Sequence, residues 1–534
     1  MQLPSCMVKV LKNTLFFFTF FSPVLSASDY SEHWITKNID IELTAAKAVG
    51  KPAIIYWGAE WCPPCNAMKA EVFGSPEFLK ATSSMLRIMI DGDGKDAQKW
   101  SDHFKATGYP TIILLNSSSE QILRFVGFVP KETVLAAIET VSQSQISVFK
   151  LLEAISKGEQ INDAQLRVLA LSDWGSNKDE LINGKETLDI ALTVFQKLPE
   201  TASIEKSQIS QFILYKASIS EKISNALKSD LEKKYPDLVK ALVASESAKR
   251  NSIPFFASSG EIIKAFIGKD VPLAEQKMRV AVWQEAVFSV ESAMDDSLTD
   301  AVNFTSAKAI IQKFQPNNPV VIKKIKTELD VLSKQMQKVK DQFLLTSLVP
   351  SLADAYESIG EIETAKRLLR TTAKRSNVPN YFLGHLAYFV EQGGNINESV
   401  RIREEAVRVA RGHSTKIQWT WSYVKAIQKS TLPRKDVLTD NALISLVEIA
   451  LSEPDGFDGR NSRYLEQAQA LMITRVKDSG KLAKFVTRSR PFCDDSNRKF
   501  KSDNFDSKCK SFFEKIAIPA DSKISKKQTQ PSEG

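Results

Sequence analysis

Two cysteines that enclose a pair of prolines, Cys62 and Cys65, are the residues of this sequence whose types and spacing could do chemistry. Residues 52–57, just before them, are apolar, β-branched and aromatic, which predicts a buried strand. Residues 67–73, just after them, carry apolar side chains at helical spacing. A thiol at a strand-to-helix turn lies near the free N–H groups and the positive dipole end of the helix, which stabilise its thiolate. The pattern therefore predicts a redox pair, with the second thiol one turn further along and within disulfide reach.

Half of a zinc site is the alternative interpretation of two cysteines at this spacing. Structural zinc needs four ligands, and within about thirty residues on either side the sequence adds only His33. Residues 91–96 partly match a calcium loop, but Lys95 stands at a ligand position and Asp96 stands where the turn needs glycine. We therefore prefer redox chemistry and expect neither a metal nor a cofactor.

The elements that must position the pair alternate between strands and helices. The pattern predicts, in chain order, a helix over 39–49, strands over 52–57 and 86–91, a helix over 96–106, strands over 111–115 and 121–128, and a helix over 131–141. Gly50 can end the first helix, and the polar residues 116–119 can turn a hairpin. With the helix that follows Cys62, the order is β-α-β-α-β-β-α, an α/β domain.

The segment 56–65, Tyr-Trp-Gly-Ala-Glu-Trp-Cys-Pro-Pro-Cys, resembles the active-site segment of the thioredoxin superfamily. With residues 66–78 it is most similar to the thioredoxin-like branch that includes the C-terminal domain of the DsbD thiol–disulfide transporter. Gly108-Tyr109-Pro110-Thr111 resembles the second signature of the superfamily, the cis-proline loop. The resemblance covers roughly residues 30–145, about a fifth of the chain.

The resemblance implies a role for five residues. Cys62 would be the nucleophile and Cys65 the resolving thiol, which together exchange a disulfide with a substrate through a mixed disulfide. Pro110 would be the cis-proline whose loop pairs with the substrate backbone, and Tyr109 would face it. Trp61 would cap the site and help to bind substrate; a packing aromatic is the alternative for this residue.

One departure from the family concerns proton transfer. Thioredoxins place a buried aspartate, the usual proton acceptor for the resolving thiol, where this chain has Tyr56, and a lysine where it has Arg87. Proton transfer would therefore run through water, through Glu60 or through the Tyr56 hydroxyl. This departure bears on rate and redox poise rather than on the type of reaction.

Length and charge exclude several classes of protein. A chain of 534 residues is too long for one core and implies two or more domains. A hydrophobic content of 43% and a charged content of 25% are typical of soluble globular proteins. The net charge of +8 is spread along the chain without an arginine-rich arm, so we expect no nucleic-acid partner.

The N-terminus has the pattern of a secretory signal over residues 1–27. Lys9 and Lys12 precede the apolar run 15–21, and small residues follow at 26–28. An uncleaved anchor is the alternative, and no later stretch is apolar enough to span a bilayer. We expect an exported protein with no membrane span after signal removal, in a bacterial periplasm, with a secreted or signal-anchored protein as alternatives.

The remaining cysteines agree with an oxidising compartment. Cys6 leaves with the signal, which leaves four cysteines in the mature chain. With Cys62 and Cys65 paired, Cys493 and Cys509 become the expected structural disulfide near the C-terminus. Two unrelated free thiols are the alternative.

Beyond the thioredoxin-like domain at 28–145, residues 146–487 have apolar residues at helical spacing and predict a large all-α domain, a helical solenoid. Six prolines are spaced as helix punctuators: Pro199, Pro236, Pro254, Pro272, Pro316 and Pro319. A disulfide-clipped segment at 488–518 and a polar, disordered tail at 519–534 would follow. Residues 454–459, Pro-Asp-Gly-Phe-Asp-Gly, predict a turn-rich loop.

A repeat around residues 345–410 resembles tetratricopeptide units. The pattern residues are Ala353, Tyr356, Gly360, Ala365 and Leu369. Ala387 and Gly394 repeat Ala353 and Gly360 at the tetratricopeptide period of 34 residues. The second unit departs from the pattern with Val390 at the aromatic position and Arg403 at a large apolar one. We therefore expect two tetratricopeptide-like hairpins rather than an array.

The sequence thus predicts an exported thiol–disulfide oxidoreductase that acts on protein disulfides, with reduction or electron relay preferred over oxidation. Its partners would be a protein thiol or disulfide substrate and a membrane thiol reductant, with the helical domain recruiting one of them near Cys62. The alternative is a helical-repeat binding scaffold whose thioredoxin-like domain is an accessory without catalysis.

Overall fold

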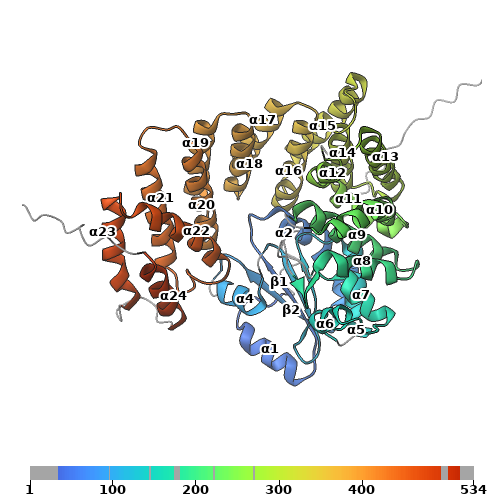
Figure 1. Cartoon of the computed structure of the whole chain (residues 1–534), viewed down its shortest axis with the longest axis horizontal. Coiled ribbons are helices and arrows are strands. Elements are labelled where there is room, and N and C mark those ends of the chain that lie inside the picture. The colour runs from blue at the N-terminus through green and yellow to red at the C-terminus, as the bar shows by residue number, and fades with distance from the viewer. Residues whose placement is uncertain are drawn as a thin grey trace, which may run out of the picture.

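The computed structural model describes residues 34–94, 97–106, 108–143, 146–173, 181–220, 223–268, 271–494 and 503–516 (Figure 1). The signal expected at 1–27 and the tail expected at 519–534 lie outside these residues. Among the described helices, none is both long enough and apolar enough to cross a membrane.

A four-stranded sheet forms the centre of the N-terminal unit. Its strands are β1 (Ala53–Gly58), β2 (Leu86–Asp91), β3 (Thr111–Leu115) and β4 (Gln121–Val126), in the order β2-β1-β3-β4. β1 is parallel to β2 and antiparallel to β3, and β3 is antiparallel to β4. Successive side chains of a strand point to opposite faces, so Ile54 and Tyr56 enter one core while Ile55 and Trp57 enter another.

Helices cover both faces of this sheet. The helices and the π-helical turn of the unit are α1 (Ile39–Ala48), α2 (Pro63–Met68), η2 (Lys69–Phe73), α3 (Pro76–Ala81), α4 (Ala97–Phe104) and α5 (Lys131–Gln143). α1 and α4 pack on the face of Ile55 and Trp57, and α2 and α5 pack on the face of Tyr56. Each predicted element lies within two residues of its observed bounds, so the predicted α/β class of this unit is confirmed.

The described chain after residue 146 is almost entirely helical, as predicted. The first helices are α6 (Val148–Ser156), α7 (Asp163–Leu171), α8 (Thr187–Lys197), α9 (Ser203–Ile219), α10 (Asn225–Ala241), α11 (Glu246–Phe256), α12 (Gly260–Phe266), α13 (Leu273–Ser289), η3 (Val290–Ala293), α14 (Leu298–Gln312) and α15 (Pro319–Lys338). The later ones are α16 (Gln342–Ser358), α17 (Ile362–Ala373), α18 (Pro379–Gln392), α19 (Ile396–Val409), α20 (His413–Lys429), α21 (Lys435–Leu451), α22 (Gly459–Arg475), α23 (Gly480–Ser489), η4 (Arg490–Asp494) and α24 (Asp503–Glu514).

Two features of this region differ from the sequence-based interpretation. A short hairpin of β5 (Leu181–Ile182) and β6 (Lys185–Glu186) interrupts the helices. Pro236 and Pro254 do not separate helices, because they lie inside α10 and α11. A proline in a helix interior removes one hydrogen bond, and the buried residues around Pro236, including Tyr235 and Leu238, show that apolar packing holds α10 together across it.

The repeat around 345–410 appears as two stacked hairpins, α16–α17 and α18–α19. Gly360 and Gly394, 34 residues apart, both adopt left-handed backbone, with φ of +84° and +85°, just after α16 and α18. The chain therefore leaves both helices by the same turn. Arg403, which departs from the repeat pattern, is half-buried and pairs with Glu391 at 2.9 Å. The stacking continues into α20 and α21 without the repeat signature.

The helices arch over the sheet rather than extending away from it. In Figure 1 the arch runs from α8 over α16 to α22 and α24, and the strands lie beneath it. α16 packs on α2, and α22 packs on α4, at two separate points. The active-site helix of the N-terminal unit therefore faces the inside of the arch.

Candidate active site

Cys62 and Cys65 lie where β1 passes into α2, and a disulfide joins them with 5.2 Å between their Cα atoms. Cys62 is the N-cap residue of α2, and its sulfur accepts a hydrogen bond of 3.2 Å from the backbone N–H of Cys65. Pro63 and Pro64 occupy the first positions of the helix, where a missing N–H costs no hydrogen bond. The backbone thus aims a donor and the positive helix end at the Cys62 sulfur.

The peptide bond between Tyr109 and Pro110 is cis. Pro110 directly precedes β3, and the register pairs Thr111 with Trp57, so Pro110 lies at the sheet edge from which the chain leads to Cys62. The ring of Tyr109 lies 4.2 Å from that of Trp57 and 5.7 Å from that of Trp61, measured between centroids. The fold therefore gathers both sequence signatures at one edge of the sheet.

Trp61 is buried, with 9% of its surface accessible to solvent. Its indole N–H donates a hydrogen bond of 3.1 Å to Asp93, and the Arg460 guanidinium lies over its ring at 5.2 Å. Trp61 and Pro110, both expected to bind substrate, are buried in this form of the chain.

The two side chains considered for proton transfer lie in different surroundings. An ideal Cβ on Gly58 would stand 2.2 Å from the Tyr56 hydroxyl and 3.1 Å from the Cys65 sulfur, so the two atoms lie on the same side of Gly58. Tyr56 is buried in the core beside Cys65. Glu60 is exposed, and it accepts a hydrogen bond of 2.7 Å from the Asn377 side chain just before α18. Of the two, Tyr56 is beside the resolving sulfur.

Two residues of the site were missed by sequence reasoning, Asp93 and Arg460. Asp93 lies in the segment 91–96, for which the sequence indicated only a partial match to a calcium loop. Its carboxylate accepts hydrogen bonds from Trp61 and Thr415. Arg460 follows the turn-rich loop 454–459 and lies 4.4 Å from the centroid of the Tyr109 ring. Thr415 lies 322 residues from Asp93, and Tyr109 is similarly far from Arg460, so no local pattern could have revealed these contacts.

Burial sets the electrostatics of these groups. Burial raises the pKa of Asp93 above its ordinary value, opposed by the hydrogen bonds from Thr415 and Trp61. Burial also raises the pKa of Tyr109, which the positive charge of Arg460 opposes. Lys69, one turn beyond Cys65, has its pKa lowered by burial and lies 5.4 Å from the Phe343 ring of α16. No group of three or more His, Cys, Asp or Glu side chains that could hold a metal occurs among the described residues.

The second cysteine pair lies in a different core from the first. A disulfide joins Cys493 of η4 to Cys509 of α24, 16 residues apart in the chain. Both cysteines are fully buried in a core formed by the C-terminal helices. The C-terminal segment is therefore part of the packed helical region, although residues 495–502 between the two cysteines are outside the description.

Comparison with known proteins identifies the N-terminal unit. Residues 39–142 match the family model of the thioredoxin-like domain. The thiol:disulfide interchange protein DsbD 2 of Pseudomonas aeruginosa is 28% identical over 85 residues, which are 16% of this chain and 14% of that protein. DsbD of Ralstonia nicotianae is 29% identical over 103 residues, 19% of this chain and 17% of the relative. DsbD of Escherichia coli K12 is 29% identical over 106 residues, 19% of both chains.

These matches span less than a fifth of this chain and less than a fifth of the relatives' length. They confirm a thioredoxin-like domain similar to that of DsbD. With the Cys62–Cys65 pair, they support thiol–disulfide oxidoreductase activity at a general level.

Proposed function

We propose that this chain is an exported thiol–disulfide oxidoreductase that acts on protein disulfides through Cys62 and Cys65, with reduction or electron relay as its direction. The observation that carries the proposal is Cys62 at the N-cap of α2 with the cis-Pro110 loop at the same sheet edge. The relatives' names, thiol:disulfide interchange proteins, support the same chemistry. We place the protein in a bacterial periplasm, which N-terminal sequencing of the mature chain would test through cleavage after residue 27.

The reaction begins with the reduced pair. The Cys62 thiolate, held by the Cys65 N–H and the helix N-terminus, attacks one sulfur of a substrate disulfide. The other substrate sulfur leaves as a thiolate and takes a proton, which gives a mixed disulfide with Cys62. Cys65 then gives its proton to water and attacks the Cys62 sulfur, which breaks the mixed disulfide. The second substrate sulfur leaves as a thiolate and takes up a proton. Two electrons have passed to the substrate, and a dithiol protein, for which we propose a membrane thiol reductant, returns them to the pair.

Tyr56 is our choice for assisting Cys65 in the second step. The hydroxyl lies on the same side of Gly58 as the Cys65 sulfur, where an O–H can donate a hydrogen bond to the developing thiolate. Glu60 is engaged with Asn377 at the rim, so we give it no part in the proton transfer. Trp61, Tyr109 and the Pro110 loop would contact the substrate backbone once the site is open.

The helical region would hold a protein substrate or partner near Cys62. A helical-repeat scaffold with an accessory thioredoxin-like domain is the second candidate, and one observation favours it. Cys62 and Cys65 are 2% and 0% exposed, so the pair is closed to another protein in this form. The position of Cys62 at the N-cap of α2 argues against this second candidate, because a purely structural disulfide does not require that geometry.

Reduction of insulin by the full-length protein, with a small dithiol as electron source, separates the two candidates. The proposal expects turnover by wild type and none by Cys62→Ser. Activity that survives the substitution, or is absent from both proteins, would contradict catalysis. A Cys65→Ser variant should retain substrates on Cys62 as mixed disulfides, because the resolving step is lost.

A further inference from the structure

The helical arch covers the redox site with two parts that are joined to the sheet in different ways. The first part, through α19, shares one continuous apolar core with the sheet face of Tyr56 and with both active-site cysteines. The second part, residues 413–494 and 503–516, forms a second core that contains Val400 of α19 but no residue of the N-terminal unit. We call this second part the C-terminal lid. Trp419 is the α20 residue of the described lid that joins the first core, where its ring fills the space beside Gly384 of α18.

The lid meets the redox site through Asp93. Its carboxylate accepts a hydrogen bond of 2.8 Å from the Thr415 backbone N–H and another from the Thr415 hydroxyl, at the first turn of α20. The same carboxylate holds the indole of Trp61, the neighbour of Cys62. One side chain of the N-terminal unit thus ties the entry to α20 to the edge of the active site.

The second contact is Arg460, at the start of α22. Its guanidinium lies over the rings of both Tyr109 and Trp61, at 4.4 and 5.2 Å, and the residue is 6% exposed. The backbone N–H of Arg460 donates 2.9 Å to the Gln98 side chain of α4. A lid residue therefore occupies the surface next to cis-Pro110, where a substrate chain would have to lie.

Further contacts along this edge are polar as well. The Gln98 side chain, which accepts the hydrogen bond from the Arg460 backbone, donates another to the Ser414 hydroxyl at 3.0 Å. The backbone N–H of Gln98 donates to the Asp455 carboxylate at 3.1 Å. Asp102 accepts from the backbone of Gly459 at 3.0 Å and pairs with Lys508 at 2.9 Å. Water can replace such contacts, so separating polar surfaces costs less than exposing an apolar core.

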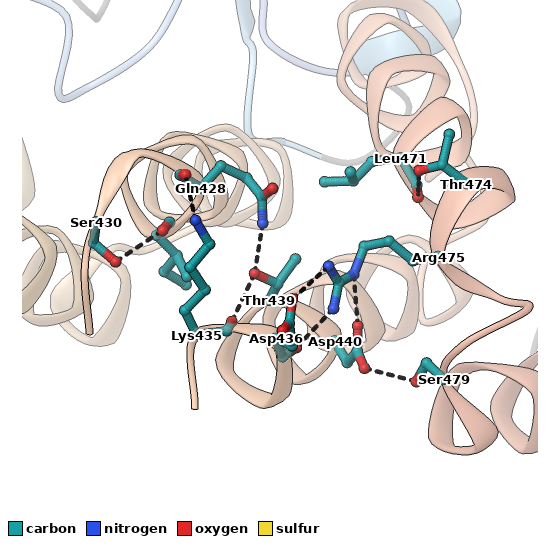
Figure 2. A network of polar contacts seen from close by, with 11 residues as sticks. Gln428, Ser430, Lys435, Asp436, Thr439, Asp440, Leu471, Thr474, Arg475 and Ser479 are labelled. Carbon is teal, nitrogen blue, oxygen red and sulfur yellow. Dashed lines mark hydrogen bonds and ion pairs between the residues drawn. The ribbon is translucent and has the colours of Figure 1, made fainter. Parts of the chain in front are cut away.

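The lid is also tied together internally, which lets it move as one body. Figure 2 shows Arg475 of α22 bonded to Asp436 and Asp440 of α21, each at 2.9 Å, and Ser479 donating to Asp440 at 2.6 Å. The Cys493–Cys509 disulfide closes the far end of the same core. Between the two parts, Gly412 adopts left-handed backbone with φ of +77° just before α20.

We propose that the C-terminal lid closes the redox site, and that Asp93 and Arg460 are the two contacts that must break before another protein can reach Cys62. This inference rests on the proposed function. A mixed disulfide requires a substrate sulfur at bonding distance, about 2 Å, from the Cys62 sulfur, and 2% exposure does not admit a protein chain. Opening at the polar edge leaves the apolar packing of α20 on α19 in place, where Trp419 enters the first core and Val400 enters the second. The lid thus makes access to Cys62, rather than the chemistry itself, the regulated step.

The test measures how fast Cys62 of the reduced full-length protein is alkylated by iodoacetamide and by a maleimide that carries a long polyethylene glycol chain. Mass spectrometry of the Cys62 peptide gives both rates, each divided by the rate for the unfolded chain. Wild type should react much more slowly with the large reagent than with the small one. Asp93→Ala and Arg460→Ala should each speed the large reagent by at least about tenfold, because each variant loses two hydrogen bonds or two cation–π contacts between the lid and the site.

Arg488→Ala is the matched control, because this exposed lid arginine pairs with Glu448 of α21, within the lid, and it should leave both rates unchanged. Thr415→Ala, on the lid side of the Asp93 contact, repeats the test should Asp93→Ala fail to fold. Equal normalised rates for both reagents in wild type, or variants that fold and react like wild type, would overturn the lid. Alkylation needs a thiol but no turnover, so a lid effect in a chain whose opened variants also fail to reduce insulin would refute only the proposed function.

Discussion

The carboxylate of Asp93 caps a helix through Thr415, a residue 322 positions further along the chain, with a hydrogen bond of 2.8 Å. The N-cap residue of α20 itself, Gly412, has no side chain to perform this role. Negative charge at a helix N-terminus is stabilising, so the N-terminal unit supplies what α20 lacks. Docking of the lid therefore also completes the cap of α20, and this relationship underlies the first prediction.

Gly412→Ala should loosen the lid. An ideal Cβ at Gly412 would stand 2.4 Å from Cγ of Asp93, and the backbone there has φ of +77°. Gly394→Ala is the matched control, because it has φ of +85° and open space around the added carbon. Both variants should lose about 1 kcal/mol from backbone strain, measured by chemical denaturation. Only Gly412→Ala should also raise the rate at which the large maleimide modifies Cys62; equal rates in both variants would contradict the close approach to Asp93.

Tyr56→Phe should slow the step in which Cys65 resolves the mixed disulfide. Loss of one hydrogen bond to the Cys65 thiolate corresponds to about a three- to tenfold effect. Rapid-quench trapping during insulin reduction should show the mixed disulfide on Cys62 accumulating in the variant. Glu60→Gln, at the exposed rim, should resolve at the wild-type rate. The opposite order of effects would assign the proton transfer to Glu60.

Glu71→Gln should remove a pH dependence of stability. Burial raises the pKa of Glu71 to about 8, and the negative charges of Asp300 and Glu132 add to the shift against the hydrogen bond from Thr299. Between its ordinary pKa and about 8, the folded chain therefore holds this proton more tightly than the unfolded chain. Wild type should lose stability as pH rises through that window.

The glutamine variant cannot ionise, so its advantage over wild type should grow with pH, by up to about 1.4 kcal/mol per pH unit. Denaturation midpoints of both proteins from pH 5 to 8.5 provide the check. A constant difference across this range would show that the carboxyl is ionised in the folded chain at all of these pH values.

Removing the second disulfide should destabilise the lid without abolishing the redox chemistry. Cys493 and Cys509 close a loop of 16 residues, for which loop entropy predicts a loss of about 3 kcal/mol in the unfolding free energy. Thermal unfolding of the double variant Cys493→Ala/Cys509→Ala should show an earlier transition, while Cys62→Ser should leave that transition in place. An unchanged melting curve would mean that packing alone holds η4 against α24.

The N-terminal unit was predictable because its signals are local. Alternating and helical apolar patterns reproduce its elements, and the strand-to-helix turn at Cys62 is visible in a dozen neighbouring residues. The helical class after residue 146 follows from periodicity in the same way. The prediction that Pro236 and Pro254 separate helices was wrong, because both lie inside a helix. A proline interrupts a helix only where tertiary packing does not compensate for the lost hydrogen bond, and that packing is not visible in the local sequence.

The sequence alone determined that two thiols lie at a helix end inside an α/β unit, and that a large helical region follows. Only the tertiary structure decided that this region folds back over the thiols, since Asp93 meets Thr415 and Arg460 meets Tyr109 across more than three hundred residues. Propensity and periodicity act over one or two turns of chain. Contacts between distant segments depend on how the helices stack, and no short stretch of sequence records that geometry.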